Sequence, residues 1–204
     1  MLLAILWLAM FLEESQLARV LVGSGVIVVV VWTFRATGVI KRTMRTTLLG
    51  AVALGALVAW GGFTDSSGVV AVIAFASAAA LALGVLALVR RIFERPRIGL
   101  PEIVAALTAY VQIAFACAFL FRGAAELLDG DFFNNGIEGQ ASDFFYFSMV
   151  TITTLGYGDL SPATSIGRSL AMTEALLGQI FLIVLVAYLV GMLGSSRTTI
   201  GRES

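Results

Sequence analysis

Histidine is absent from this sequence, and cysteine occurs once among its 204 residues. Without an imidazole there is no histidine base for catalysis, no histidine metal ligand and no histidine switch near neutral pH. Cys117 cannot form a disulfide within the chain, and it lies in an apolar run, where we expect a small buried side chain. Carboxylates, hydroxyls and backbone groups are left to carry any chemistry, so we expect no enzyme activity and no cofactor.

Charge is also scarce, because only 13% of the residues are charged while 59% are hydrophobic. A soluble domain has about a quarter of its residues charged. This excess of apolar residues, with a mean hydropathy of +0.99, predicts a protein embedded in lipid. The formal net charge is zero, so nothing indicates binding to nucleic acid.

Six apolar runs are candidates for the helices of roughly 20 residues that cross a bilayer. They cover residues 1–12, 17–34, 47–60, 69–89, 103–121 and 169–193. The first resembles the core of a signal peptide, but it lacks a basic start and a small-residue cleavage site, so we interpret it as a truncated or oblique helix. The expected fold is all-α and integral to the membrane, with six transmembrane helices.

The loops between these runs alternate in charge. Basic residues gather at 35–45, 90–97 and 197–202, whereas the other loops are acidic. By the positive-inside rule the basic loops and both termini are cytoplasmic, and the loop 122–168 faces outward. The predicted location is the plasma membrane, which in a bacterium is the inner membrane.

Charges and two prolines near residue 95 divide the chain into two parts. We expect a four-helix membrane domain at 1–92, a cytoplasmic linker at 93–101, a second domain at 102–195 and a short cytoplasmic tail at 196–204. Within the second domain the sequence predicts an outer helix at 102–124, a short helix at 142–153, a polar strand at 154–159 and an inner helix at 167–194.

The short helix is the unusual element of the second domain. Ser142 is a good N-cap residue, and Asp143 suits the first turn. An apolar run of about ten residues, at 1.5 Å per residue, reaches only ~15 Å, which is half of a bilayer. Backbone that returns from this depth is tolerated only if it is buried in protein or lines water. The polar strand that follows should therefore line an aqueous path.

The strand contains Gly156 and Gly158, two positions apart. Consecutive carbonyls point to one side only if the backbone alternates between right- and left-handed conformations, and glycine reaches positive φ at little cost. A ring of such strands would replace the water shell of a cation with carbonyl oxygens. The Thr154 hydroxyl adds an oxygen at the inner end, and the short helix points the negative end of its dipole toward the same place.

Thr154-Leu155-Gly156-Tyr157-Gly158 resembles the TVGYG selectivity filter of potassium channels, and Asp159 extends the match to GYGD. The resemblance covers the second domain, about half of the chain, and the helix arrangement is similar to six-segment tetrameric potassium channels of bacteria. It implies a homotetramer in membrane lipid that conducts K⁺ passively. It also implies roles for individual residues: K⁺ coordination by Thr154, Leu155, Gly156 and Tyr157; support of the filter by Thr153, Gly158, Asp159, Tyr146 and Phe147.

Several of these implied roles have an alternative. Tyr146 and Phe147 occupy the positions of an aromatic cuff, but generic apolar packing would also explain them. The resemblance further implies that the Tyr157 ring turns away from the axis and packs on the short helix. Leu155 replaces the usual valine, and we expect selectivity to survive because the carbonyl is kept. Val150 replaces a carboxylate that pairs with the filter aspartate in some bacterial channels, so inactivation should differ.

Gating is less well specified by the sequence. A voltage sensor needs several arginines along one helix, each worth about 2.3 kcal/mol per 100 mV, and 69–89 contains none. We therefore expect no steep voltage dependence. Gly178 matches the hinge glycine of the family, although close helix packing would also explain it. Glu174 is either a brace against the short helix or a proton-sensitive gating element.

Three further alternatives stay open. Acidic residues in the outward loop concentrate cations at its mouth or merely keep the loop solvated, namely Glu126, Asp129, Asp131 and Glu138. A non-selective cation channel shares this architecture but usually alters the tyrosine or glycine of the filter. A regulatory channel subunit is compatible with the same sequence.

Overall fold

The computed structural model describes residues 66–94, 99–128, 131–137 and 139–198. The predicted helices at 1–12, 17–34 and 47–60 lie outside these ranges, as do Asp129 and Glu138. The described elements are four α-helices and one 3₁₀ turn: α4 (Ser67–Glu94), α5 (Leu100–Leu127), η1 (Asn134–Gly136), α6 (Ala141–Ile152) and α7 (Ser165–Thr198). Within the described ranges the only extended pairing is an isolated bridge between Phe133 and Pro162.

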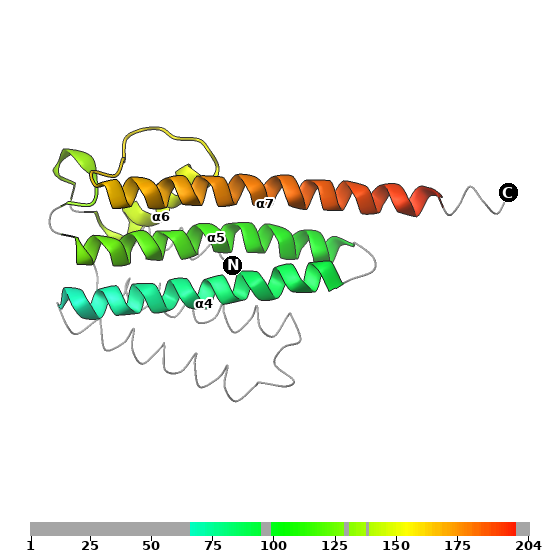
Figure 1. Cartoon of the computed structure of the whole chain (residues 1–204), viewed down its shortest axis with the longest axis horizontal. Helices are drawn as coiled ribbons and strands as arrows, with labels where there is room; N and C mark the ends of the chain where they lie inside the picture. The colour runs from blue at the N-terminus through cyan, green and yellow to red at the C-terminus, as the bar shows by residue number, and fades with distance from the viewer. Residues whose placement is uncertain (1–65, 95–98, 129–130, 138, 199–204) are drawn as a thin grey trace, which may run out of the picture.

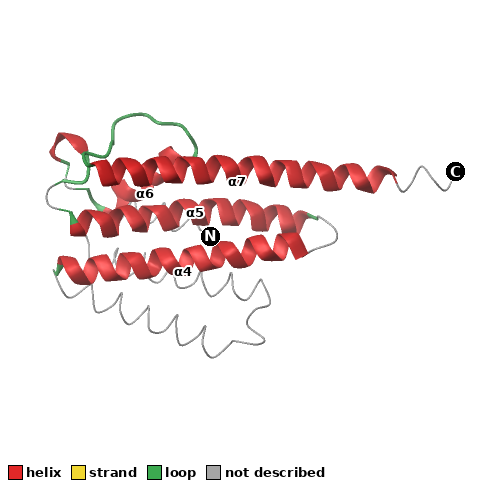
Figure 2. Ribbon diagram, in the orientation of Figure 1, coloured by secondary structure: helices red, strands yellow, loops and turns green. Residues whose placement is uncertain are grey.

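Three long helices lie side by side, and the short α6 lies at one end of them (Figure 1). α4 and α5 form a closely packed antiparallel hairpin, and α7 runs along α5. α6 contacts both α5 and α7, and green loops on either side connect it to them (Figure 2). The expected re-entrant segment is thus held between the two helices that flank it in the sequence.

α4, α5 and the Ser165–Tyr188 part of α7 are each long and apolar enough to cross a membrane. At 1.5 Å per residue, the 28 residues of α5 extend about 42 Å, more than the roughly 30 Å hydrocarbon core. The 12 residues of α6 extend only about 18 Å. The described part of the chain is therefore an all-helical, multi-pass membrane protein with one helix that is too short to cross.

Helix boundaries differ from the predicted ones, most clearly at the linker. α4 continues to Glu94 and α5 begins at Leu100, so only 95–99 remain of the predicted linker 93–101. Pro101 does not interrupt α5 because it lies in the first turn, where its missing N–H is not needed. α5 also runs past residue 124 to Leu127, and α7 extends the predicted 167–194 at both ends, taking in part of the predicted tail.

Two buried clusters hold the helices together. The first joins α4, α5 and α6 through Leu81, Phe115 and Phe145. Next to it the Phe75 ring lies directly over Gly123, where a Cβ atom would come within 3.0 Å of the ring. The second is a cluster of phenylalanine rings beneath the outward loop, with centroids 5.0–5.8 Å apart: Phe121, Phe132, Phe133, Phe144 and Phe147. Edge-to-face and tilted ring pairs of this kind add to the free energy gained by burial.

Candidate functional site

α6 begins one residue earlier than predicted. Its N-cap residue is Gln140, not Ser142, and the Gln140 N–H donates to the Asp143 carboxylate at 2.8 Å. Asp143 therefore caps the helix from its third position, where a carboxylate also interacts favourably with the helix dipole. The sequence interpretation chose Ser142 because serine is the better N-cap residue type. It missed the bond from the Gln140 N–H to Asp143, which determines where α6 begins.

The strand after α6 alternates in backbone handedness. Thr154, Gly156 and Gly158 have φ values of 57°, 56° and 82°. A Cβ atom on either glycine would meet no atom within 4 Å, so the space beside both glycines is open in the single chain. The left-handed conformation of Thr154 was not predicted, because a β-branched residue at positive φ is strained and gives no signal in the sequence.

The N–H groups of this strand turn back toward α6. The N–H groups of Leu155 and Gly156 both donate to the Val150 carbonyl, at 3.0 and 3.4 Å, and that of Thr154 donates to Thr151. No described residue donates a hydrogen bond to the carbonyls of residues 154–157. The strand thus uses its donors to anchor itself and leaves consecutive carbonyl oxygens free, which is what a cation requires of its ligands.

The two threonines at the start of the strand differ in their contacts. The Thr153 hydroxyl donates to the Met149 carbonyl at 2.6 Å and so belongs to the end of α6. The Thr154 hydroxyl has no partner among the described residues. This oxygen is accordingly available beside the carbonyls, as the sequence led us to expect.

Tyr146 ties the outer end of the strand to α6. Its hydroxyl donates to the Asp159 carboxylate at 2.8 Å. This bond lowers the pKa of Asp159 below its usual range and raises the pKa of Tyr146 to about 12. Phe147, by contrast, is buried in the phenylalanine cluster, 5.2 Å from the Phe121 ring. Of the two aromatic residues singled out in the sequence, Phe147 has the apolar packing role and Tyr146 contacts the strand.

The loop after the strand is fixed by backbone bonds to the segment that lies between α5 and α6. The N–H of Asn134 donates to the Ser161 carbonyl at 2.8 Å, and that of Ala163 donates to the Phe132 carbonyl at 2.9 Å. Arg122 completes this outer layer: it donates to the Gly139 carbonyl, pairs with Glu126 and lies over the Phe144 ring. Glu126 therefore lies in α5 and pairs with Arg122 one turn earlier, which neither of its two interpretations predicted.

Glu174 is buried where α5, α6 and α7 meet, with 1% of its surface exposed. Ser148 of α6 is hydrogen-bonded both to the Glu174 carboxyl and, at 2.6 Å, to the Ala114 carbonyl of α5. A serine hydroxyl has one proton and cannot donate to two acceptors at once. A neutral Glu174 carboxyl would donate to the Ser148 hydroxyl while that hydroxyl donates to the Ala114 carbonyl, and this is the assignment that we test below. The contact with α6 is the brace that the sequence offered as one interpretation.

Gly178 contacts the end of α6. A Cβ atom on Gly178 would lie 2.5 Å from Ile152 Cγ1 and 3.2 Å from the Ile152 carbonyl oxygen. The same carbonyl accepts a hydrogen bond from the Tyr110 hydroxyl of α5 at 2.8 Å. Close packing thus suffices to explain this glycine, whether or not α7 also bends there.

The single chain leaves much of the site uncovered. Leu155 and Tyr157 are 56% and 68% exposed. The Tyr157 ring was expected to pack on the short helix, but within the single chain it is not buried against α6. Gln179 is also exposed, within an apolar span, and has no hydrogen-bond partner among the described residues. Sequence reasoning missed Gln179, although a lone amide one residue after Gly178 in an apolar run was a usable signal.

With this geometry established, the chain was compared with known proteins. Residues 105–195 match the ion channel family. This part of the chain is similar to an ion-channel domain. It comprises α5, α6, the strand and most of α7. The match supports a channel rather than an enzyme, as the sequence predicted.

The chain also has curated relatives. An inward rectifier potassium channel of Paramagnetospirillum magnetotacticum is 36% identical over 84 residues, 37% of this chain and 28% of that protein. A protein of Rhodopseudomonas palustris named as a potassium channel is 30% identical over 84 residues, 41% of this chain and 19% of that protein. The match therefore spans less than a third of the length of either relative. No solved structure matches the chain significantly.

Proposed function

We propose that this protein is a potassium-selective channel whose filter is built from the carbonyl oxygens of Thr154, Leu155, Gly156 and Tyr157. The observation that carries the proposal is the alternation of positive φ at residues 154, 156 and 158, combined with carbonyls that accept no bond within the described part of the chain. Both relatives are named as potassium channels, which favours K⁺ over other cations.

The working unit is a homotetramer in the bacterial inner membrane. One strand supplies only one side of the coordination shell of an ion, so a closed ring needs further copies around an axis. The exposure of Leu155 and Tyr157 fits this arrangement, and the Tyr157 ring then packs on the short helix of a neighbouring copy. The basic loops and both termini face the cytoplasm, by the positive-inside rule.

Gln179 faces water below the filter. The residues of α7 that lie against α4 and α5 include Ile180, Val184 and Tyr188, and Gln179 lies on the opposite face of the helix. An amide exposed to lipid at this depth would lose its hydrogen bonds with water, which costs several kcal/mol. A water-filled cavity beneath the filter removes this cost. Gly178 and Glu174 are candidates for gating in the same region.

Gating by voltage is not steep. Within α4 the stretch 67–89 contains no arginine or lysine, and the basic pair Arg90 and Arg91 lies at the end of the helix, outside most of the field. The proposal has two alternatives, a non-selective cation channel and a regulatory subunit that conducts only together with another protein.

Reconstitution of the purified full-length protein in liposomes tests the proposal. Under opposed K⁺ and Na⁺ gradients the current should reverse near the K⁺ potential. Reversal near zero would show a non-selective channel, and current that requires a second protein would show a regulatory subunit. The mass of the purified complex should be four times that of the chain.

Two glycine variants link that current to the strand. Gly156→Ala should abolish K⁺ selectivity, because alanine is strained at a φ of 56° although no atom obstructs its side chain. Gly136→Ala is the matched control, since Gly136 also has a positive φ, of 70°, and lies in the outward loop away from the strand. It should assemble and keep its selectivity. An equal loss of K⁺ selectivity in both variants would mean that the loss does not arise from the filter strand.

A further inference from the structure

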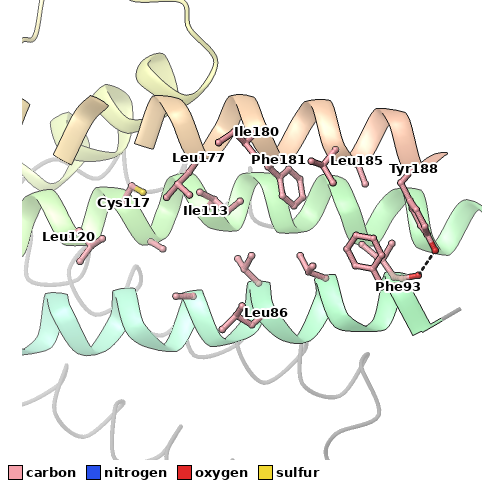
Figure 3. A pocket seen from close by; sticks show the side chains of 16 residues that line it. Leu86, Phe93, Ile113, Cys117, Leu120, Leu177, Ile180, Phe181, Leu185 and Tyr188 are labelled. Carbon is pink, nitrogen blue, oxygen red and sulfur yellow. Dashed lines mark hydrogen bonds between the residues drawn. The ribbon is translucent and has the colours of Figure 1, made fainter. Parts of the chain in front are cut away.

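A cavity of about 540 Å³ lies between α4, α5 and α7, away from the filter strand (Figure 3). Its walls are aliphatic and aromatic side chains from all three helices, such as Leu86, Ile113, Leu120 and Leu177. Along α7 it extends from Leu177 to Tyr188, about 16 Å at the helical rise, which is half of a bilayer. The shape is that of a slot for one chain within one leaflet.

This cavity is open along one side, where the lining side chains of Leu86, Phe93 and Leu177 are exposed, and its walls offer water few polar partners. The polar group at its end is the Tyr188 hydroxyl, which already donates to the Ile92 carbonyl at 3.4 Å, and the Tyr188 ring contacts Phe93 with centroids 4.9 Å apart. A buried water needs two to four polar partners, and an apolar cavity of this size instead takes up apolar molecules. In a membrane the abundant molecule of this kind is a lipid acyl chain.

The charge beside the cavity selects the kind of lipid. Arg90 follows Leu86 by four residues and precedes Phe93 by three, so it shares a face of α4 with two lining residues. It is exposed and has no hydrogen-bond or ion-pair partner among the described residues. Arg91 points elsewhere, because at about 100° per residue it lies about 140° around the helix from Leu86 and about 160° from Phe93. A cation at the rim of an apolar slot matches an anionic headgroup joined to an acyl chain.

We propose that this cavity binds one acyl chain of an anionic phospholipid, with the headgroup held at Arg90. Because the slot is lined by α4 and α5 on one side and α7 on the other, the bound chain links the peripheral hairpin to the inner helix. Within the described residues the site is formed by these three helices and does not include the strand, so the inference goes beyond the proposed ion selectivity and is tested independently of it.

Native mass spectrometry of the full-length protein, with added phosphatidylglycerol or phosphatidylcholine, tests the site. We expect phosphatidylglycerol to remain bound at about one molecule per chain. Ala82→Phe fills the slot and should weaken this binding at least tenfold. Ala79→Phe, at an exposed position one turn away on α4 that does not line the cavity, is the matched control and should bind as the unaltered protein does.

A second pair of variants tests the headgroup. Arg90→Gln should reduce the preference for phosphatidylglycerol over phosphatidylcholine several-fold, and Arg91→Gln should leave it unchanged. The proposal is overturned if the unaltered protein binds the two lipids equally. It is also overturned if Ala82→Phe and Ala79→Phe weaken binding equally, or if Arg90→Gln and Arg91→Gln change the lipid preference equally.

Photocrosslinking provides a test that does not depend on the folding of a variant. A phosphatidylglycerol with a diazirine in its acyl chain should label peptides of α4, α5 and α7 that line the slot in the unaltered protein. Labelling confined to other peptides would overturn the proposal, because it would mean that another part of the chain or a second copy occupies the slot.

Discussion

At the scale of single residues, the Tyr146 hydroxyl determines the acid response of the outer filter. Because its hydrogen bond lowers the pKa of Asp159, the carboxylate stays ionised until the pH falls below the ordinary value of 3.8. The stabilisation that the bond provides is present above that range and is lost as the pH falls through the lowered pKa. Tyr146→Phe should move this loss up toward pH 3.8, and the decay of K⁺ current at decreasing external pH measures it.

The control for this prediction is another tyrosine hydroxyl. Tyr110→Phe also removes a hydrogen bond to the α6 region, but its acceptor is the Ile152 carbonyl, which does not titrate. It should leave the external acid response where it is in the unaltered protein. The same acid response in Tyr146→Phe would contradict the assigned role of the Tyr146–Asp159 bond.

Glu174 and Ser148 form the second residue pair with a measurable consequence. Glu174→Gln should preserve stability, because an amide imitates the neutral acid and donates to Ser148. Ser148→Ala removes the partner from a fully buried carboxyl, and we expect a loss of about 1–3 kcal/mol in the free energy of unfolding. Thermal unfolding of the purified protein in detergent measures both effects.

A surface hydroxyl serves as the control for this pair. Thr173→Ala removes an exposed hydroxyl that bonds only to the Ser169 carbonyl of its own helix, so it should cost little. If Glu174→Gln destabilises as much as Ser148→Ala, the neutral-acid assignment is wrong. Currents of Glu174→Gln across pH separate the brace from a gating role, because an unchanged pH response leaves only the brace.

At the scale of elements, the contact between α6 and α7 passes through Gly178. Gly178→Ala places a methyl group 2.5 Å from Ile152 and should destabilise the protein by about 1–3 kcal/mol through overpacking. Gly191→Ala on the same helix meets no neighbour within 4 Å and should be neutral or stabilising, as expected for glycine to alanine in a helix. Thermal unfolding of the two variants gives the comparison.

A compensating substitution separates packing from bending. Gly178→Ala should also change the open probability of the channel if this contact matters for gating. Ile152→Ala combined with Gly178→Ala makes room for the new methyl group. The double variant should therefore recover the open probability of the unaltered protein if overpacking caused the change. A defect in open probability that persists in a well-folded double variant would instead point to bending of α7 at Gly178.

The elements also show what sequence patterns can specify. The short helix, the glycine alternation and the three described apolar spans follow from local composition and spacing, and the sequence predicts them well. The contact of Ser148 with Glu174 links residues 26 positions apart and depends on how two helices are rotated about their axes, which no local pattern determines. The φ of Thr154 has the same origin, since bonds from the end of α6 impose a conformation that threonine alone would avoid.

At the scale of the whole molecule, one chain supplies every residue of the proposed filter strand but would form only one side of an ion path. The exposed side chains of Leu155, Tyr157 and Gln179 all belong to surfaces that further copies would cover or that water would fill. For the same reason the expected packing of the Tyr157 ring was not found within the chain. The sequence contains no residue pattern that distinguishes contacts within a copy from contacts between copies.

The turn between α4 and α5 bears on how such copies come together. Residues 95–99 can reach roughly 20 Å even when fully extended, and α4 is packed along α5 of its own chain. Because α4 is held this way, it cannot be swapped onto α5 of a neighbouring copy. In the proposed tetramer, each subunit should therefore complete its hairpin during insertion, before it meets its partners, and whole subunits should exchange between complexes without any helix being unthreaded first.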